Sequence, residues 1–215
     1  MSLLLTVLFI GVLAAAIISF AVMGFRQFRR SRALARKAYD AGLHFTQADL
    51  FDVARRYGDF ALISRGHSGR ASNVTYGRIE GMSVRAFDFC SEMGHGTQRL
   101  ICRDGAVVIE TRMELPSLLM WNEKKLSFAP MAVRGCDKHI GNWLCSGNMD
   151  LAEALARELP EMGSAGINIQ ARGGSLMLSA QPTVQSGSYI LTFAEIGKIA
   201  HCLAKWLAIE PPQPG

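Results

Sequence analysis

Dense cysteine, long charged runs and internal repeats are all missing from this sequence of 215 residues. Charged residues make up only 19% of it and hydrophobic residues 49%, so the chain is too apolar for a disordered or charged linker protein. Five cysteines are too few for a disulfide-stapled scaffold of this length. The sequence therefore predicts one folded part and, at its N-terminus, an unusually apolar segment.

The apolar segment covers residues 3–24 and contains no charged side chain. At 1.5 Å per residue, a helix of this length is about 33 Å long, which matches a hydrocarbon core of about 30 Å. A cleaved signal peptide would carry positive charge before a shorter apolar stretch, whereas only Met1 and Ser2 precede this one. We therefore expect residues 1–24 to be an uncleaved transmembrane anchor.

Six cations follow the apolar segment, and none precedes it. Because Lys and Arg beside a single span are retained on the cytoplasmic side, they predict a single pass through the cytoplasmic (inner) membrane. The N-terminus would lie outside and the C-terminal domain in the cytoplasm. We expect these cations to bind anionic lipid head groups, each gaining about 1 kcal/mol. The six are Arg26, Arg29, Arg30, Arg32, Arg36 and Lys37.

The formal net charge of +5 comes from this basic collar. Removing six from the 23 basic residues leaves 17 against 18 acidic ones, so the rest of the chain is nearly neutral. A nucleic-acid surface is therefore not expected. The expected partners are the anionic head groups of the lipid bilayer and another membrane or cytoplasmic protein.

The cysteines are expected to be free thiols, because the cytoplasm is reducing. The grouping most like a metal site is Cys136 with His139, and it has no second pair at the spacing of a zinc site. We therefore expect no metal site and no cofactor.

The span and its basic extension are predicted to form one continuous helix, which makes residues 25–42 a basic juxtamembrane helix. Gly42 offers the left-handed cap that ends it. Thr46 and Asp49 have the spacing of a capping box and predict a short helix over residues 47–56.

Short β-branched and aromatic runs separated by glycines follow and predict strands. Glu80-Gly81 would be a tight turn, and Gly94 and Gly96 would reverse the chain. Asp104-Gly105 is either a hairpin turn or a bulge. No connection is long enough for a parallel crossover, so the sheet is predicted to be antiparallel. The predicted strands are 60–64, 74–79, 82–89, 98–112 and 118–121.

The last third is predicted to add a strand, a helix, a hairpin and a closing helix. The strand covers residues 140–145, and the helix begins near Asp150 and stops at Pro160. Alternating residues on both sides of Gly173-Gly174 predict a hairpin over 167–180. The closing helix follows a capping box, in which Thr192 is the cap and Glu195 its partner.

These elements predict an α+β fold: an antiparallel sheet region with packed helices, preceded by a single N-terminal transmembrane helix. The cytoplasmic α+β domain is expected to cover residues 43–210. A subdivision near 130–138 is left open, and residues 211–215 are expected to be a flexible tail.

The most distinctive polar run is residues 65–73. Its Gly-His-Ser sequence resembles the nucleophile elbow of hydrolases, but Arg70 replaces the second required glycine and a strand follows instead of a helix. Two other interpretations stay open: a polar loop between strands, or a nest for a phosphate or carboxylate. The candidate ligand-binding residues are Arg65, His67, Arg70, Asn73 and, from the glycine turn, His95.

Asp88 is flanked by Phe87 and Phe89 in a predicted strand. We expect a half-buried carboxylate with a structural partner, such as Arg85 or a backbone donor, in preference to an acid or base in catalysis. No complete catalytic motif is recognised, so no catalytic residue is assigned.

The run at 65–73, the Tyr76-Gly77 pair and the Phe-Asp-Phe run at 87–89 together form the pattern RGHSxRASNxxYG…FDF. This pattern resembles a group of uncharacterised bacterial membrane-anchored proteins, whose cytoplasmic part follows one or more membrane segments. The resemblance covers about residues 50–207 and implies the same anchor and fold. Because no activity is established for the group, it implies no catalytic residue.

We therefore expect a membrane-tethered cytoplasmic interaction domain that is not an enzyme. The alternative is a membrane-bound enzyme or a receptor for a small anionic ligand, with its site near Arg65, Asn73 and His95. A concave pocket joining these two loops would favour the alternative, and their separation on the sheet would favour an interaction domain.

The topology is testable with a reporter fused after Gly215. Since six cations follow the span, the reporter should work only if it functions in the cytoplasm. Alkaline phosphatase activity from this fusion in intact bacteria would refute the orientation and, with it, the expectation of reduced thiols.

Overall fold

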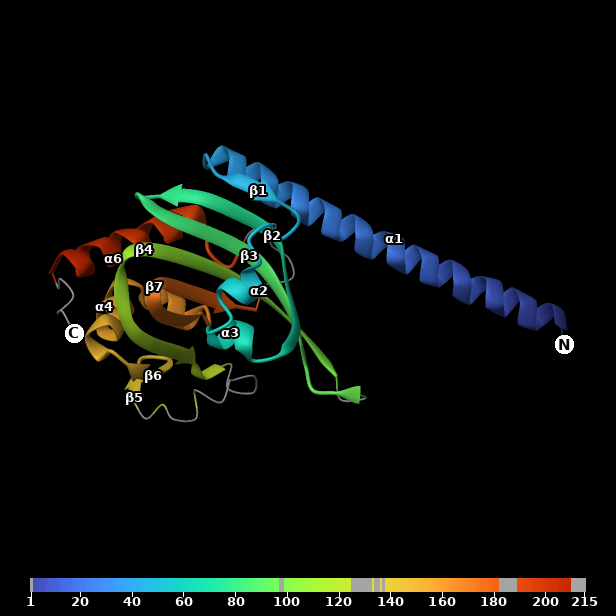
Figure 1. Ribbon diagram of the computed structural model, residues 1–215. Helices are drawn as coiled ribbons and strands as arrows, with labels where there is room; N and C mark the ends of the chain where they lie inside the picture. The colour runs from blue at the N-terminus through green and yellow to red at the C-terminus, as the bar shows by residue number, and fades with distance from the viewer. Residues whose placement is uncertain are drawn as a thin grey trace.

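A computed structural model describes residues 2–96, 99–124, 133, 136, 138–181 and 189–209. Helices pack on a seven-stranded antiparallel sheet, and a long N-terminal helix projects away from it (Figure 1). The α+β fold class predicted from the sequence is confirmed.

The helices are α1 (Ser2–Asp40), α2 (Val53–Arg56), α3 (Ala61–Ser64), α4 (Met149–Glu158), α5 (Pro160–Ser164) and α6 (Phe193–Ile209). The strands are β1 (His44–Thr46), β2 (His67–Ile79), β3 (Met82–Met93), β4 (Leu100–Asn122), β5 (Lys138–Ile140), β6 (Trp143–Gly147) and β7 (Asn168–Ala180). Their order in the sheet is β1-β2-β3-β4-β6-β5, and β7 pairs with β4.

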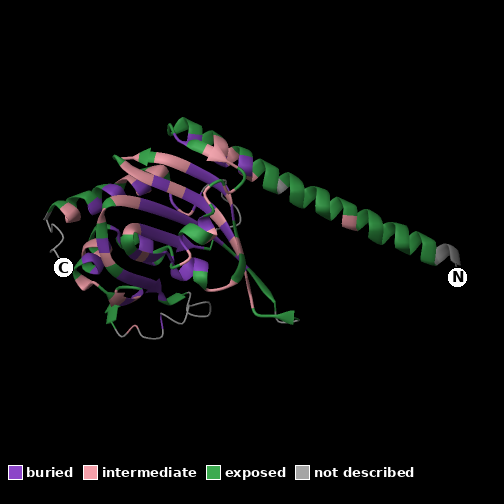
Figure 2. Cartoon of the chain, viewed as in Figure 1, coloured by how far each residue is buried: buried purple, intermediate pink, exposed green. Residues whose placement is uncertain are grey.

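Helix α1 is continuous, as predicted, and Gly42 follows it with a φ of +70°. In the described part of the chain, α1 is the one helix that is long and apolar enough to cross a membrane. Its large apolar side chains between Leu5 and Phe28 are exposed along the projecting part (Figure 2). The single anchor helix near the N-terminus therefore fits a membrane-anchored protein.

The other end of α1 packs on the sheet. Leu34 and Ala38, four residues apart on one helix face, are completely buried, and Leu34 belongs to the main hydrophobic core. Arg32, Arg36 and Lys37 on the other side of the helix are exposed. The last turns of α1 therefore contribute to the folded core, which the sequence-based division at residues 42 and 43 does not include.

Strand β4 is the spine of the sheet. It pairs with β3 along its first half, with β6 at its end and with β7 over most of its length. Asp104-Gly105 is neither a turn nor a bulge, because Gly105 lies within the ladder, opposite Asp88 and Ala180. A Cβ at Gly105 would come within 2.5 Å of Cγ2 of Ile190, so close packing of the chain before α6 explains the glycine.

Each face of the sheet carries its own hydrophobic cluster. Val107 and Ile109 of β4 face a core that includes residues of α4 and α6, whereas Ala106 and Val108 face a cluster that includes residues of α2 and α3. All four side chains are completely buried. This alternation with a period of two is the signature of a strand covered on both faces.

Of two predicted elements near residue 60, one is wrong and the other is shorter than predicted. The predicted strand at 60–64 is helix α3, whose Ala61, Leu62 and Ile63 are all buried; a short apolar run does not distinguish strand from helix. The predicted helix at 47–56 is only α2, because the Asp49 carboxylate accepts hydrogen bonds from the backbone N–H groups of Phe51 (3.0 Å) and Val53 (2.9 Å). These bonds hold the preceding residues in a turn.

Two predictions in the last third are also wrong. The predicted hairpin at 167–180 is the single strand β7, in which Gly173 has a φ of +55° but pairing with β4 continues on both sides. The register shifts there, so Gly173 serves a bulge and not a turn. The predicted strand at 140–145 is divided into β5 and β6 by a turn at Gly141.

The helix signals near the C-terminus are confirmed. The Thr192 N–H donates to the Glu195 carboxylate (2.6 Å), and the Glu195 N–H donates to Thr192 Oγ1 (3.2 Å), which is the predicted capping box of α6. Helix α4 ends before Pro160, and its cap is Asn148, one residue before the helix. The subdivision near 130–138 falls largely outside the described residues, and the tail at 211–215 does so completely.

The packing of α1 is testable by truncating Leu34. Leu34→Ala should lower the free energy of unfolding by about 2–5 kcal/mol, because it leaves a cavity in the main core. Tyr39→Ala is the matched control: Tyr39 is exposed on the same helix, and its removal should cost about 0.5 kcal/mol or less. Urea unfolding in detergent micelles measures both values, and equal values would contradict the packing.

Candidate functional site

The five candidate ligand residues do not form one site. Arg65 is buried against Asp104 on one face of the sheet, and Asn73 is buried against Asp88 on the other face. Asp104 lies opposite Phe89, the residue after Asp88, so alternation of strand side chains sends the two carboxylates to opposite faces. The remaining three candidates, His67, Arg70 and His95, are exposed.

The ion pair of Arg65 with Asp104 is almost fully buried, with side-chain exposures of 4% and 5%. It ties the turn after α3 to β4. Removing one partner of such a pair leaves a buried charge without compensation and costs about 3–5 kcal/mol. The guanidinium of Arg65 is therefore bound within the protein by Asp104 and is not presented to a ligand.

His67 and His95 are brought together, as the alternative hypothesis requires. Their rings stack with centroids 5.1 Å apart and an angle of 4° between their planes. Nε2 of His67 lies 3.0 Å from the Gly94 carbonyl oxygen. The predicted loop at 65–73 is wrong, since most of it is the start of β2, and the histidines stack at the exposed end of this strand.

Ser68 does not have the geometry of a catalytic nucleophile. Its Oγ lies 3.2 Å from Nδ1 of His67, and the nearest Glu92 oxygen lies 3.9 Å from the same nitrogen. A serine hydrolase needs the hydroxyl and the carboxylate on opposite ring nitrogens, and here the Gly94 carbonyl occupies the other one.

A polar network that the sequence did not reveal joins α1 to the sheet; we call Arg30, Asp88, Asn73, Thr75 and Tyr189 the junction. Arg30 donates two hydrogen bonds to Asp88, from Nη2 to Oδ1 (2.7 Å) and from Nε to Oδ2 (3.1 Å). Asn73 donates a third to Oδ2 (2.9 Å). Asp88 is half-buried and has structural partners, as expected, but these are Arg30 and Asn73 instead of Arg85. Arg30, which we grouped with the lipid-binding cations, is therefore bound by this carboxylate.

The backbone of β2 is shaped to build the junction. Asn73 has a φ of +51° at a register shift, and its N–H donates to the Gln47 carbonyl (3.1 Å). The Tyr189 hydroxyl donates to the Asn73 carbonyl (2.6 Å) and lies 2.6 Å from Oγ1 of Thr75. Burial raises the pKa of Tyr189 above its ordinary value, which keeps the hydroxyl protonated as a donor.

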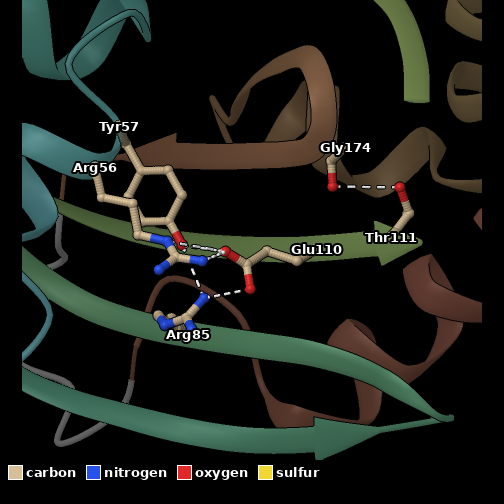
Figure 3. A network of polar contacts seen from close by, with 6 residues as sticks. All are labelled: Arg56, Tyr57, Arg85, Glu110, Thr111 and Gly174. Carbon is tan, nitrogen blue, oxygen red and sulfur yellow. Dashed lines mark hydrogen bonds and ion pairs between the residues drawn. The ribbon is translucent and has the colours of Figure 1, made fainter. Parts of the chain in front are cut away.

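A second network, shown in Figure 3, joins α2 to β3 and β4 around Glu110. Glu110 accepts hydrogen bonds from Tyr57 (2.8 Å), Arg56 (2.9 Å) and Arg85 (2.5 Å). Burial alone would raise the pKa of Glu110, but the bonds from Arg85, Tyr57 and Arg56 outweigh it and lower this pKa. A carboxylate held ionised by three donors is a structural anchor and is poorly suited to act as a base.

The pKa of Tyr57, on the other side of this network, shifts in the opposite direction to that of Glu110. Burial and the bond to Glu110 raise the pKa of Tyr57 to about 12. Arg85 also donates to the Tyr57 hydroxyl (2.9 Å), so the phenol is both donor and acceptor. The same view shows Thr111 donating to the Gly174 carbonyl (3.2 Å), where β7 meets the irregular part of β4 (Figure 3).

A hollow of about 570 Å³ lies away from all of these groups, between α6, the end of α4 and the turn from β2 to β3. Its charged lining is mixed and includes Glu80, Glu158, Lys198 and Lys205. In the part of the chain that the structure describes, no three His, Cys, Asp or Glu residues gather as metal ligands would. The cysteines in that part form no disulfide, and burial raises the pKa of Cys145 to about 11.

The geometry of Ser68 predicts that it does not react as a nucleophile. A fluorophosphonate probe should leave the full chain unlabelled, and Ser68→Ala should change the free energy of unfolding by about 0.5 kcal/mol or less. Labelling is read by mass spectrometry, beside a serine hydrolase as positive control. A covalent adduct on Ser68 would refute this reading.

The Glu110 network predicts a loss of stability in acid. Because the pKa of Glu110 is lowered on folding, its contribution is present above the ordinary glutamate pKa and is lost as the pH falls through the lowered value. Glu110→Gln should therefore be less stable than the native chain near neutral pH, and the difference should shrink below about pH 4. Urea unfolding over a pH series tests this, with the exposed Glu114→Gln as control; a constant difference would contradict it.

The sequence matches no family model and no curated protein. The fold is similar to the crystal structure of the mycobacterial trehalose monomycolate transport factor A, TtfA, with a TM-score of 0.56. The superposition covers 86% of this chain and 98% of that chain, at 16% sequence identity. At this identity the similarity shows a shared fold.

Proposed function

We propose that this chain is a non-enzymatic interaction domain, held in a fixed orientation at the cytoplasmic face of the inner membrane, where it supports a transport process. Three features support this. The fold is shared with a protein named as a transport factor, α1 can cross a membrane, and the candidate ligand residues are divided between two sheet faces.

The observation that carries the proposal is the junction. Arg30 lies on the same continuous helix as the apolar span, and it is bound by Asp88 in the middle of the sheet. A flexible linker would let a tethered domain rotate freely, whereas this contact gives the domain one orientation relative to α1. Fixed orientation benefits a protein that must present one face to a membrane partner.

The junction also sets the distance of the domain from the bilayer. Arg30 lies six positions after Gly24, the end of the predicted span, which corresponds to about 9 Å along a helix. The exposed cations of this part of α1, Arg29, Arg32, Arg36 and Lys37, are then placed at or near the head groups, which suits the predicted binding of anionic lipids.

The experiment separates tethering from orientation. A flexible Gly-Ser linker inserted between Gln27 and Phe28 keeps both the span and the junction but removes the rigid connection. The control is the same linker inserted after Gly141, in the turn between β5 and β6. Tagged full-length chains are purified from solubilised membranes, and co-purifying proteins are quantified by mass spectrometry.

The native chain and the Gly141 insertion should retain the same membrane-transport protein, and the insertion after Gln27 should lose it. Retention by all three chains would show that orientation does not matter and would refute the fixed-orientation proposal. Turnover of a small substrate by the purified native chain would refute the non-enzymatic part.

A further inference from the structure

The ends of β2, β3 and β4 form an arm that extends beyond the two hydrophobic clusters; we define it as His67–Arg70, Cys90–His95 and Arg99–Arg103. In the view of Figure 1, its tip projects toward the same side as the N-terminal part of α1. Figure 2 shows that the tip is exposed. The arm is thus directed toward the side on which a membrane crossed by α1 would lie.

The tip of the arm carries exposed apolar side chains. Leu100 is 46% exposed and its neighbour Ile101 is 57% exposed. In the described part of the chain outside α1, the only other large apolar side chain as exposed as these is Leu50. Exposing two adjacent apolar side chains to water is unfavourable, whereas the same side chains would be stabilised in a membrane interface.

The arm is also basic. Arg70, Arg99 and Arg103 are exposed, and Glu92 is its only acidic residue. The hydrogen bond from Arg99, with smaller contributions from His67 and Arg70, outweighs the effect of burial and lowers the pKa of Glu92, so this carboxylate neutralises only one of the cations. The remaining positive charge complements anionic head groups.

Strand register places this charge on the face that α1 crosses. Arg70 and Arg103 both lie opposite Cys90, one from each neighbouring strand. Cys90 is two residues from Asp88, so all three side chains are on the face where Asp88 binds Arg30 of α1. The cations of the arm therefore face the side of the sheet from which the membrane helix departs.

We propose that this arm is a second membrane contact, in which Leu100 and Ile101 enter the bilayer interface while Arg70 and Arg103 bind anionic lipid head groups. The bilayer is favoured over a protein partner because the junction holds the arm on the side toward which the span leaves the domain, and because the exposed cations of the arm complement anionic head groups. The contact adds to the proposed function, which needs only α1 for attachment.

The full chain is reconstituted in nanodiscs of brominated phosphatidylcholine, with or without phosphatidylglycerol, because bromine quenches a tryptophan that reaches the acyl chains. Leu100→Trp should lose emission in brominated lipid relative to the same variant in unbrominated lipid. The matched control is Tyr39→Trp, an exposed aromatic position at the far end of α1, which should keep its emission. The native chain supplies the background from its own tryptophans.

The charge is tested in the Leu100→Trp background. Arg70→Glu with Arg103→Glu should reduce the quenching and abolish its increase with phosphatidylglycerol, whereas Lys198→Glu with Lys205→Glu on α6 should not. Urea unfolding verifies that both pairs remain folded. A probe at residue 100 that is quenched no more than the probe at residue 39 overturns the proposal and leaves the arm for a protein partner. Quenching unaffected by the arginine changes overturns it as well. Neither result depends on co-purification, so the proposed function can fail or stand separately.

Discussion

The carboxylate of Asp88 is the constraint on which the architecture depends, because it has to be neutralised in the half-buried centre of a strand. Its partners come from two distant places: Arg30, 58 residues earlier on α1, and Asn73 on β2. Asn73 reaches it only from a left-handed backbone conformation, and its carbonyl is then held by Tyr189. The Asp88 carboxylate is therefore connected to three parts of the chain: α1 through Arg30, the irregular part of β2 at Asn73, and, through Asn73, the segment before α6 that carries Tyr189.

The long strand β4 connects the two hydrophobic clusters of the domain. Its alternating residues supply both hydrophobic clusters, and Glu110, near its middle, draws Arg85 of β3 and Tyr57 beside α2 to one point. The irregular stretch that follows Glu110 is where the register with β7 shifts. Each face of the sheet thus has one partly buried carboxylate that binds side chains from other elements. Asp88 lies on one face and Glu110 on the other, and burial without these partners would be unfavourable for both.

Local signals in the sequence were sufficient for the elements that depend on local contacts. The apolar length of α1 and the capping box of α6 are properties of neighbouring residues, and both were predicted. Strand β7 was not, because Gly173-Gly174 has the composition of a turn and only pairing with β4 keeps it extended. For the candidate site, the sequence left open whether His67 and His95 meet, and the structure stacks them. Strand alternation puts Asp104 and Asp88, the partners of Arg65 and Asn73, on opposite faces, which no loop prediction contains. No local signal distinguishes Arg30 from the other arginines of its basic run, because its partner, Asp88, is 58 residues away in the sequence.

Strand β3 runs from the hollow beside α6 to the basic arm. It begins at Met82, beside the hollow lined by Glu80 and Lys198, and ends at Met93 in the basic arm. Twelve residues of extended chain cover about 40 Å, so the two surfaces lie at opposite ends of the sheet. The end that carries the arm lies toward the N-terminal part of α1, and the end that carries the hollow lies away from it (Figure 1). If, as we propose, the ion pair of Arg30 with Asp88 holds the domain in one orientation to the bilayer, it would also set which end of the sheet is near the lipid.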